Sequence, residues 1–316
     1  MTRYVLRRLV WCVPVLLGAS LIIFTLLRFL PGDVVDVILG TEGSATPEVR
    51  ETIRRLFGLD RPIHIQYLAW LGAVLGGDLG SSLRTSEPVG RILISRLPVT
   101  IELAVLSVTL SVLIAVPLGV IAAVRRGGLV EIVSRLIGLI GLSLPNFWLA
   151  TMLILTASLW FQWLPSLIYV SPFVDPVENL KQMALPTVSL ALTLMAIVLR
   201  MTRSTMLEVL GQDYVKTARS KGLAERVVLA RHALRNAFIP VITVVGVQMG
   251  TLFGGAVVIE QIFGLPGMGW TFVNGIYQRD YPTVQGAVLM LAACFVLVNL
   301  LVDLTYAYLD PRIRYE

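Results

Sequence analysis

Residues 213–240 read DYVKTARSKGLAERVVLARHALRNAFIP and form the most basic short segment of a chain that is otherwise largely apolar. Their pattern predicts a short helix from Tyr214 to Lys221, capped by the side chain of Asp213 and closed by a left-handed turn at Gly222. A second helical run, Ala224 to Phe238, leads to Pro240 at the edge of the next hydrophobic run. We therefore expect a helix, a glycine turn and a second helix that stand off the apolar body of the protein.

Composition places the chain among membrane proteins. Of its 316 residues 56% are hydrophobic and 15% are charged, with a mean hydropathy of +0.80, whereas soluble domains carry roughly 25% charged residues. The net charge of +6 could suggest nucleic acid. The basic residues are scattered over segments on both sides of a bilayer, however, so we expect no nucleic-acid partner. Cys12 and Cys294 lie inside apolar runs and are interpreted as small core residues.

Six hydrophobic runs are long enough to cross a membrane as helices, because about 20 apolar residues span a hydrocarbon core of roughly 30 Å. The first run is longer than the apolar part of a signal peptide and lacks a small-x-small cleavage site, so we expect it to be retained. The six expected spans are Leu9–Leu30, Val99–Val124, Ile132–Trp160, Leu185–Met206, Val241–Phe263 and Val284–Leu304.

The basic residues of the short connections predict the orientation. If six spans alternate, the basic residues before the first span, after the second, between the fourth and fifth, and at the C-terminus all fall on one side. Residues 200–235 alone carry eight basic and three acidic residues. The positive-inside rule makes this side cytoplasmic and places both termini there.

The long segment between the first two spans is expected to lie outside the membrane and to contain two short helices. One begins at Thr46 and Pro47 and ends near Gly58, and the other runs from Pro62 to about Leu75. They form either a compact lid on the spans or a docking surface for a partner. We therefore divide the chain into residues 1–97, the first span with the outer segment, and residues 98–316, a core of five spans with a cytoplasmic loop at 207–239.

Small residues indicate where helices touch. Gly246, Gly250 and Gly254 recur every fourth residue in the fifth span, a spacing that lets helix backbones approach closely. Gly138 and Ser143 are candidates for a similar contact in the third span. We favour packing within the chain over a ligand site, and a contact with a second subunit is the alternative.

The chain lacks the motifs of an enzyme or a self-powered transporter. None of its lysines, Lys181, Lys216 and Lys221, follows a glycine, so the P-loop signature GxxxxGK is missing. Its histidines, His64 and His232, fall on opposite sides of the membrane, which excludes HExxH, and no GxSxG occurs. We expect no catalytic residue, cofactor or metal in this chain.

Charged residues are expected only near span ends, unlike the mid-membrane carboxylates of ion-coupled carriers. Glu102 and Asp303 are interpreted mainly as interfacial or interhelical hydrogen-bonding residues. Gln248 and Asn299 are neutral polar residues deep in the spans, and Glu260 faces the outer side. These last three are our candidates for a translocation path: Gln248, Glu260 and Asn299.

At residues 216–235 the chain resembles the EAA loop of binding-protein-dependent ABC importer permeases, whose pattern is Glu-Ala-Ala, three residues, Gly, nine residues, Ile-x-Leu-Pro. Aligned on Gly222, the EAA positions hold Lys216, Thr217 and Ala218, and the Ile, Leu and Pro positions hold His232, Leu234 and Arg235. Only Ala218, Gly222 and Leu234 fit that consensus. The segments YVKTARSKGL at 214–223 and RHALRNAFIPV at 231–241 instead resemble the peptide and nickel branch. So do PGD at 31–33, GDLGSSL at 77–83, RMTRSTMLEVLGQDY at 200–214, RDYPTVQG at 279–286 and NLLVDLTYAYLDPRIR at 299–314.

The resemblance implies an all-α, six-span type I ABC importer permease in the inner membrane of a prokaryote. Its implied partners are a homologous second permease, forming a heterodimer, two cytoplasmic ATPases that bind ATP and Mg, an extracytoplasmic substrate-binding protein and membrane lipid. In the helical hairpin of residues 213–240, the loop from Lys216 to Gly222 would then supply the coupling helix that sits on one ATPase. The residues assigned to this coupling are Asp213, Tyr214, Lys216, Thr217, Ala218, Arg219, Lys221, Gly222, Leu223, Arg226, His232, Leu234 and Arg235.

The substrate is open at this point. Di- or oligopeptides are expected, as in the first permease subunit of dipeptide importers, with nickel chelates, glutathione and peptide-like antimicrobials as alternatives. An autonomous channel or secondary carrier is the alternative from a different class. A membrane enzyme lacks a catalytic cluster, and a structural scaffold leaves the hairpin unexplained.

Overall fold

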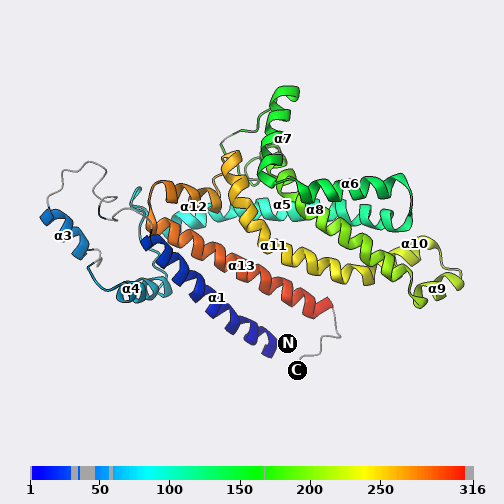
Figure 1. The fold of residues 1–316 in the computed structure, drawn as a ribbon, viewed down its shortest axis with the longest axis horizontal. Helices are drawn as coiled ribbons and strands as arrows, with labels where there is room; N and C mark the ends of the chain where they lie inside the picture. The colour runs from blue at the N-terminus through cyan, green and yellow to red at the C-terminus, as the bar shows by residue number, and fades with distance from the viewer. Residues whose placement is uncertain (1, 30–34, 36–46, 57–59, 167, 310–316) are drawn as a thin grey trace.

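A computed structural model describes residues 2–29, 35, 47–56, 60–166 and 168–309. Apart from an isolated bridge between Ser81 and Pro88, the regular structure in these ranges is helical (Figure 1). The elements are α1 (Thr2–Phe29), α3 (Pro47–Leu56), α4 (Ile63–Leu75), α5 (Val89–Val124), α6 (Leu129–Ser143), α7 (Asn146–Phe161), α8 (Pro176–Leu210), α9 (Asp213–Ser220), α10 (Glu225–Val227), the π-helix η1 (Val228–Leu234), α11 (Arg235–Phe263), α12 (Met268–Tyr277) and α13 (Tyr281–Leu309).

Five of the six predicted spans coincide with long apolar helices. In the described ranges, five helical stretches are long and apolar enough to cross a membrane. They are Val10–Arg28, Val89–Val124, Pro176–Leu210, Glu225–Phe263 and Tyr281–Val302. The predicted all-α polytopic fold is confirmed, and several of these helices extend beyond the apolar run that revealed them.

The predicted continuous helix Ile132–Trp160 is wrong. The structure divides this run into α6 and α7, which bend by 108° at the break. Leu144 is extended, with φ −90° and ψ 128°, and Pro145 follows it. The proline ring disfavours helical backbone at the preceding residue, so the helix stops there even though the sequence stays apolar. A sixth span exists only if α6 and α7 together count as one.

Helix α8 is the centre of the bundle and packs against α5, α6, α7 and α11 (Figure 1). Close approach to its neighbours depends on glycine. A side chain at Gly119 of α5 would lie 2.7 Å from Thr202 Cβ, and one at Gly141 of α6 would lie 2.8 Å from Ala196 Cβ. These two glycines let three helices share one core. A Cβ at Gly138, by contrast, would have no atom of the described residues within 4 Å.

Serine hydroxyls join α5 to α8 within the core. Ser111 Oγ donates to the carbonyl of Ala191 at 2.8 Å, and Ser107 Oγ donates to that of Thr187 at 3.5 Å. Together with Ala115 and Gly119, these serines form a stripe of small residues at every fourth position of α5. The glycines of the fifth span have the same four-residue spacing. The stripe of α5 was not among the helix contacts predicted from the sequence.

The glycines of α11 pack against α13 at two of the three predicted positions. A Cβ at Gly246 would collide with Val302, and one at Gly250 would collide with Phe295. Gly254 is exposed, and a Cβ there would have no atom of the described part of the chain within 4 Å, so Gly254 is not part of the contact between α11 and α13.

Helices α1 and α13 run antiparallel along one side of the bundle, and α4 lies against the end of α1 (Figure 1). Phe24 of α1 contacts Tyr67 and Trp70 of α4, with ring centroids 5.4 and 5.6 Å away, and Tyr67 shares a 2.9 Å hydrogen bond with Ser20. The second outer helix follows Pro62 and ends at Leu75, as predicted. Helix α3 begins at the predicted Pro47, whereas Thr46 and Gly58 lie outside the described residues.

The segments at 77–83 and 279–286, far apart in the sequence, meet at Asp280. Its carboxylate accepts hydrogen bonds from Ser82 Oγ at 2.5 Å, the Leu83 amide at 3.1 Å and Thr283 Oγ1 at 2.7 Å. Asp280 is only 4% exposed. This buried carboxylate fixes the chain before α5 to the start of α13.

Candidate functional site

The predicted hairpin is present where α8 ends and α11 begins. There α9 and α10 project beyond the bundle (Figure 1). Asp213 is not the capping residue, which corrects the sequence prediction. Gln212 occupies the cap with extended backbone, φ −73° and ψ 148°, and Asp213 is the first helical residue. The Asp213 carboxylate instead accepts a 2.9 Å hydrogen bond from Lys216, which lowers the pKa of Asp213. Both groups are exposed, so their pair adds little stability.

The turn at Gly222 has the expected left-handed conformation, with φ +76°. The Gly222 amide donates to the Arg219 carbonyl at 2.9 Å, and the Leu223 amide donates to the Ala218 carbonyl at 3.4 Å. This pair of bonds closes a helix when the residue after its end is left-handed. A side chain at Gly222 would meet no neighbour but would force strained backbone.

An ion pair joins the two arms of the hairpin across the turn. Arg219 donates to both carboxylate oxygens of Glu225, at 3.1 and 2.7 Å. Arg219 is one of the residues that the sequence assigns to coupling with a partner. In this conformation its guanidinium binds within the chain, so any partner carboxylate must compete with Glu225.

Buried apolar side chains attach α9 to the end of α8. Val215 and Val228 are fully buried and Ala218 is 6% exposed. They pack against the half-buried Val209 and Leu210 at the end of α8. The hairpin therefore moves with α8 because its base is part of the packed core.

A hydrogen bond attaches α9 of the hairpin to α11 as well. Asn236 Nδ2 of α11 donates to Tyr214 Oη of α9 at 2.9 Å and also to the His232 carbonyl at 3.0 Å. Leu234 is half-buried in the cluster below the hairpin. The hairpin is thus tied to both membrane helices that carry it.

The second arm differs from the predicted helix Ala224–Phe238. It consists of α10 and the π-helix η1, and it continues through Pro240 as α11 to Phe263 without a break. Pro240 removes only one backbone donor, and the neighbouring Ala237 and Val241, each 1% exposed, hold the helix in the core. The second arm of the hairpin and the fifth apolar run therefore form one continuous helix, Glu225–Phe263.

The outer surface of the hairpin combines apolar and basic groups. Tyr214, Leu223 and Val227 are 42%, 41% and 41% exposed. The remaining predicted coupling residues divide between exposed and bonded positions. Lys221, Arg226 and Arg235 are exposed, His232 is half-buried, and Thr217 donates to the Asp213 carbonyl at 2.9 Å.

Glu260, one of the predicted path residues, is fully buried where α5, α11 and α12 meet. Its Oε1 accepts from Thr100 Oγ1 at 2.6 Å, and its Oε2 accepts from the Trp270 amide at 3.0 Å. Thr100 Oγ1 in turn accepts from the Met268 amide at 2.8 Å. A side chain at Gly267 would collide with this carboxyl group, so the start of α12 closes over it. In this conformation Glu260 orients α12.

The other two predicted path residues do not face each other. Asn299 of α13 shares a helix face with Phe295 and Val302, which contact α11. Gln248 lies two residues from Gly246 and therefore on roughly the opposite face of α11 from α13. Both side chains are half-buried. The structure does not bring the three candidates together.

Glu102 accepts a hydrogen bond, as its sequence interpretation suggested. Tyr169, in the connection between α7 and α8, donates to Glu102 Oε2 at 2.6 Å. Burial, together with this hydrogen bond and the nearby carboxylate, raises the pKa of Tyr169. The side chain of Asp303 lies outside the described part of the structure.

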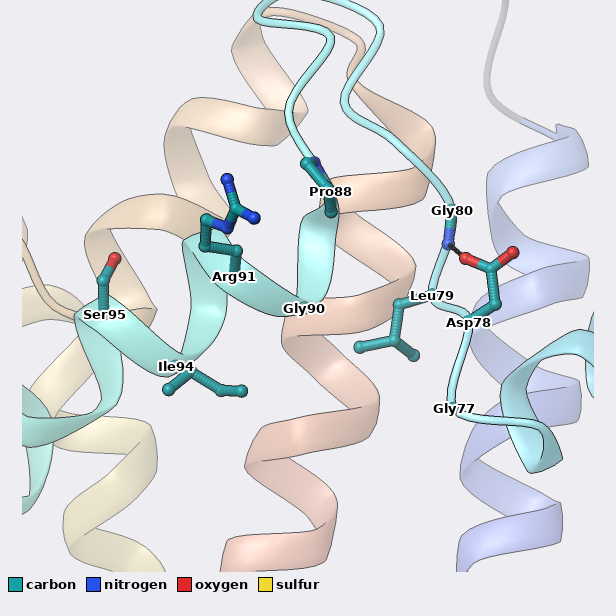
Figure 2. A pocket seen from close by; sticks show the side chains of 9 residues that line it. All are labelled: Gly77, Asp78, Leu79, Gly80, Pro88, Gly90, Arg91, Ile94 and Ser95. Carbon is teal, nitrogen blue, oxygen red and sulfur yellow. Dashed lines mark hydrogen bonds between the residues drawn. The ribbon is translucent and has the colours of Figure 1, made fainter.

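A pocket of about 580 Å³ lies at the opposite end of α5 from the hairpin. Figure 2 shows the Gly77–Gly80 loop on one side of it and the first turns of α5 on the other, so that Asp78 and Arg91 come from different walls. Gly77 and Gly80 have φ of +85° and +81°, and the Gly80 amide donates to Asp78 Oδ1 at 2.8 Å. Within the described residues no group of three potential His, Cys, Asp or Glu metal ligands occurs.

Residues 115–315 match the family of binding-protein-dependent transport system inner membrane components, and residues 1–104 match the N-terminal family of such membrane components. A putative peptide transport system permease protein of Brucella abortus is 44% identical over 100% of both chains. The dipeptide transport system permease protein DppB of Escherichia coli K12 is 39% identical, again over 100% of both chains.

The fold resembles that of a solved transporter. An inward-facing structure of the MetNI methionine ABC transporter superposes with a TM-score of 0.57 and 20% identity, covering 72% of this chain and 100% of that one. At this identity the likeness concerns the fold alone.

Proposed function

Because the chain belongs to the family of binding-protein-dependent transport system inner membrane components, we propose that it is the membrane-spanning permease subunit of an ABC importer for peptides. The observation that carries the substrate class is full-length identity of 39–44% to peptide and dipeptide permeases. The chain is an inner membrane protein and the permease component of the importer, not its ATPase. A binding protein and an ATPase are its implied partners.

Several finer features of the assembly are part of the proposal. This chain forms a heterodimer with a homologous second permease, and two ATPases beneath the pair bind ATP and Mg. Residues 98–316 form the core of the permease, and residues 1–97 supply a peripheral first span and an extracytoplasmic helical segment. The packing of α1 along α13, at the side of the bundle, supports this division.

The hairpin around Gly222 is the proposed coupling element. It rests on buried Val215 and Val228 and is hydrogen-bonded to α11 through Tyr214, so a push on α9 moves α8 and α11 together. Its exposed face presents an apolar centre with basic neighbours, a composition suited to a protein groove edged by carboxylates. Closure of the ATPases on ATP would draw two such hairpins together and open the spans outward.

The outer face is the proposed docking side. The pocket between the Gly77–Gly80 loop and α5 (Figure 2) and the turn at Asp280 contact the binding protein or the sister permease. Gln248 and Asn299 remain candidates for the translocation path, and Glu260 acts on it indirectly by setting the position of α12.

Reconstitution tests the function. The complete importer in proteoliposomes is expected to take up a labelled dipeptide only with binding protein outside and ATP on the ATPase side. Competition by unlabelled oligopeptide, glutathione and nickel chelate then ranks the substrate classes. Uptake by this chain without any ATPase would contradict the proposal and identify an autonomous carrier.

A further inference from the structure

A second pocket, of about 260 Å³, lies between α6 and α8, away from both the hairpin surface and the outer pocket. It is lined by Ser134, Arg135, Gly138, Leu139 and Leu142 of α6 and by Leu199, Arg200 and Arg203 of α8.

The lining of the pocket is basic at one end and apolar at the other. Glu131 pairs with Arg203 near the start of α6, and Gly141 packs on Ala196 near its end, so the two helices run antiparallel. The arginines therefore gather at the end of the pocket beside Glu131, and the leucines line the end beside Gly141. The exposed fractions of Leu139 and Leu142 are 64% and 46%, so the apolar end is open to the surroundings of the bundle.

The basic end carries excess positive charge. Glu131 Oε1 accepts from both Arg135 and Arg203 at 2.5 Å, and Oε2 accepts from the Gly127 amide at 2.6 Å. One carboxylate thus binds two guanidinium groups, and Arg200 adds a third positive charge to the lining of the pocket. Arg200 is exposed and makes no ion pair with any acidic residue in the described ranges.

Two buried donors in the same pocket lack acceptors. Ser134 is 1% exposed, and its Oγ has no hydrogen-bond partner among the described residues. The buried Nε of Arg203 has none either. Buried polar groups are rarely left unpaired. These two unpaired donors lie beside three arginines that, in the part of the chain that the structure describes, have only the Glu131 carboxylate to balance their charge. We take this as an indication that an anionic oxygen group completes the site.

We propose that this pocket binds an anionic phospholipid, whose phosphate contacts Ser134, Arg200 and Arg203 and whose acyl chain follows Leu139 and Leu142. A phosphate offers acceptor oxygens to several donors at once. A soluble phosphate would satisfy the donors but leave the apolar end of the pocket bare. The basic end also lies on the side that the positive-inside rule assigns to the cytoplasm, where basic pockets between membrane helices bind anionic head groups.

This site is independent of the coupling hairpin and of transported substrate, so it is tested by lipid binding. The complete importer is placed in nanodiscs of phosphatidylcholine, with or without phosphatidylglycerol. Phosphatidylglycerol retained after detergent extraction is quantified and the unfolding temperature is measured. The wild-type complex is expected to retain phosphatidylglycerol selectively and to unfold at a higher temperature with it.

Three variants sharpen the test. Arg200→Gln removes a guanidinium without breaking an ion pair and is expected to weaken phosphatidylglycerol binding about fivefold. Gly138→Phe fills the pocket from a position where a Cβ meets no atom, and it is expected to abolish selective retention while the complex still assembles. Arg126→Gln is the matched control, an exposed arginine in the α5–α6 turn outside the pocket, and it should bind like wild type.

Three results would overturn the proposal. Equal retention by wild type, Arg200→Gln and Gly138→Phe would show that the pocket does not select the lipid. Inorganic phosphate that raises the unfolding temperature in phosphatidylcholine discs as far as phosphatidylglycerol does would identify a soluble anion. A Leu139→Cys variant that cross-links to the sister permease in high yield would show that a protein covers the pocket.

Discussion

Replacing Glu260 with alanine should destabilise the junction of α5, α11 and α12. The substitution leaves the Thr100 hydroxyl and the Trp270 amide, both now bonded to the carboxyl group, without acceptors in a buried site. Each unsatisfied buried donor costs about 1–3 kcal/mol, so Glu260→Ala should cost roughly 4 kcal/mol. Glu260→Gln keeps one acceptor oxygen but turns an amide N–H₂ toward the second donor, so we expect about half that loss.

The assay combines stability with local exchange. Unfolding of the purified chain is followed by titration with a denaturing detergent, and hydrogen exchange reports the amides of Met268 and Trp270. Glu260→Ala should lower the midpoint and accelerate exchange at the start of α12, and Glu260→Gln should fall between it and wild type. Glu208→Ala, which removes an exposed carboxylate on α8, is the control and should change stability by less than about 0.5 kcal/mol. A Glu260→Ala protein with wild-type stability and exchange would refute the assignment.

Three further predictions concern other junctions. Arg219→Glu breaks the pair with Glu225 and should reduce ATPase stimulation by the binding protein. Adding Glu225→Arg should restore stimulation, and failure of this rescue would mean that Arg219 acts on a partner instead. Asp280→Ala should cost roughly 6 kcal/mol in the same detergent titration, because two hydroxyl donors and one amide donor lose their acceptor; an unchanged midpoint would contradict this. The raised pKa of Tyr169 means that its neutral phenol stabilises the folded protein. This stability is present below about pH 10 and is lost as the pH rises further. The unfolding temperature should therefore fall less steeply above about pH 10 in Tyr169→Phe than in wild type.

The sequence predicted features that depend on local pattern. Hydrophobic length located five of the six spans because the bilayer sets the length of an apolar helix. The turn at Gly222 was predictable because a lone glycine between two polar helical runs is the residue that tolerates a positive φ there.

The errors arose where local pattern is ambiguous. Pro145 lies inside an apolar run, and prolines at 98, 117, 186 and 240 remain inside continuous helices. A proline alone therefore does not reveal which helix breaks. Asp213 and Gln212 differ by one position, and the extended backbone of Gln212 decided which of them is the cap.

Pairings between distant residues could not be predicted. Glu131 binds Arg203, and Asp280 binds Ser82, across separations that only the folded bundle closes. Many arginines could have neutralised Glu131, and nothing in the spacing distinguishes Arg203 from the others. The small-residue stripe of α5 through Ser107 and Ser111, by contrast, was visible as a four-residue repeat and would have revealed the contact with α8.

We propose that the hairpin transmits ATPase motion to the spans, and a pair of glycine substitutions tests this role. Gly222→Val forces a β-branched residue to φ +76°, at a strain of about 1–2 kcal/mol or more, whereas Gly211→Val lies at the other end of α9 with φ −81° and no such strain. The measurement is binding-protein-stimulated ATP hydrolysis by fully assembled complexes in proteoliposomes. We expect Gly222→Val to lose the stimulation of ATP hydrolysis and Gly211→Val to keep it. Equal stimulation in both would contradict the coupling role of the hairpin.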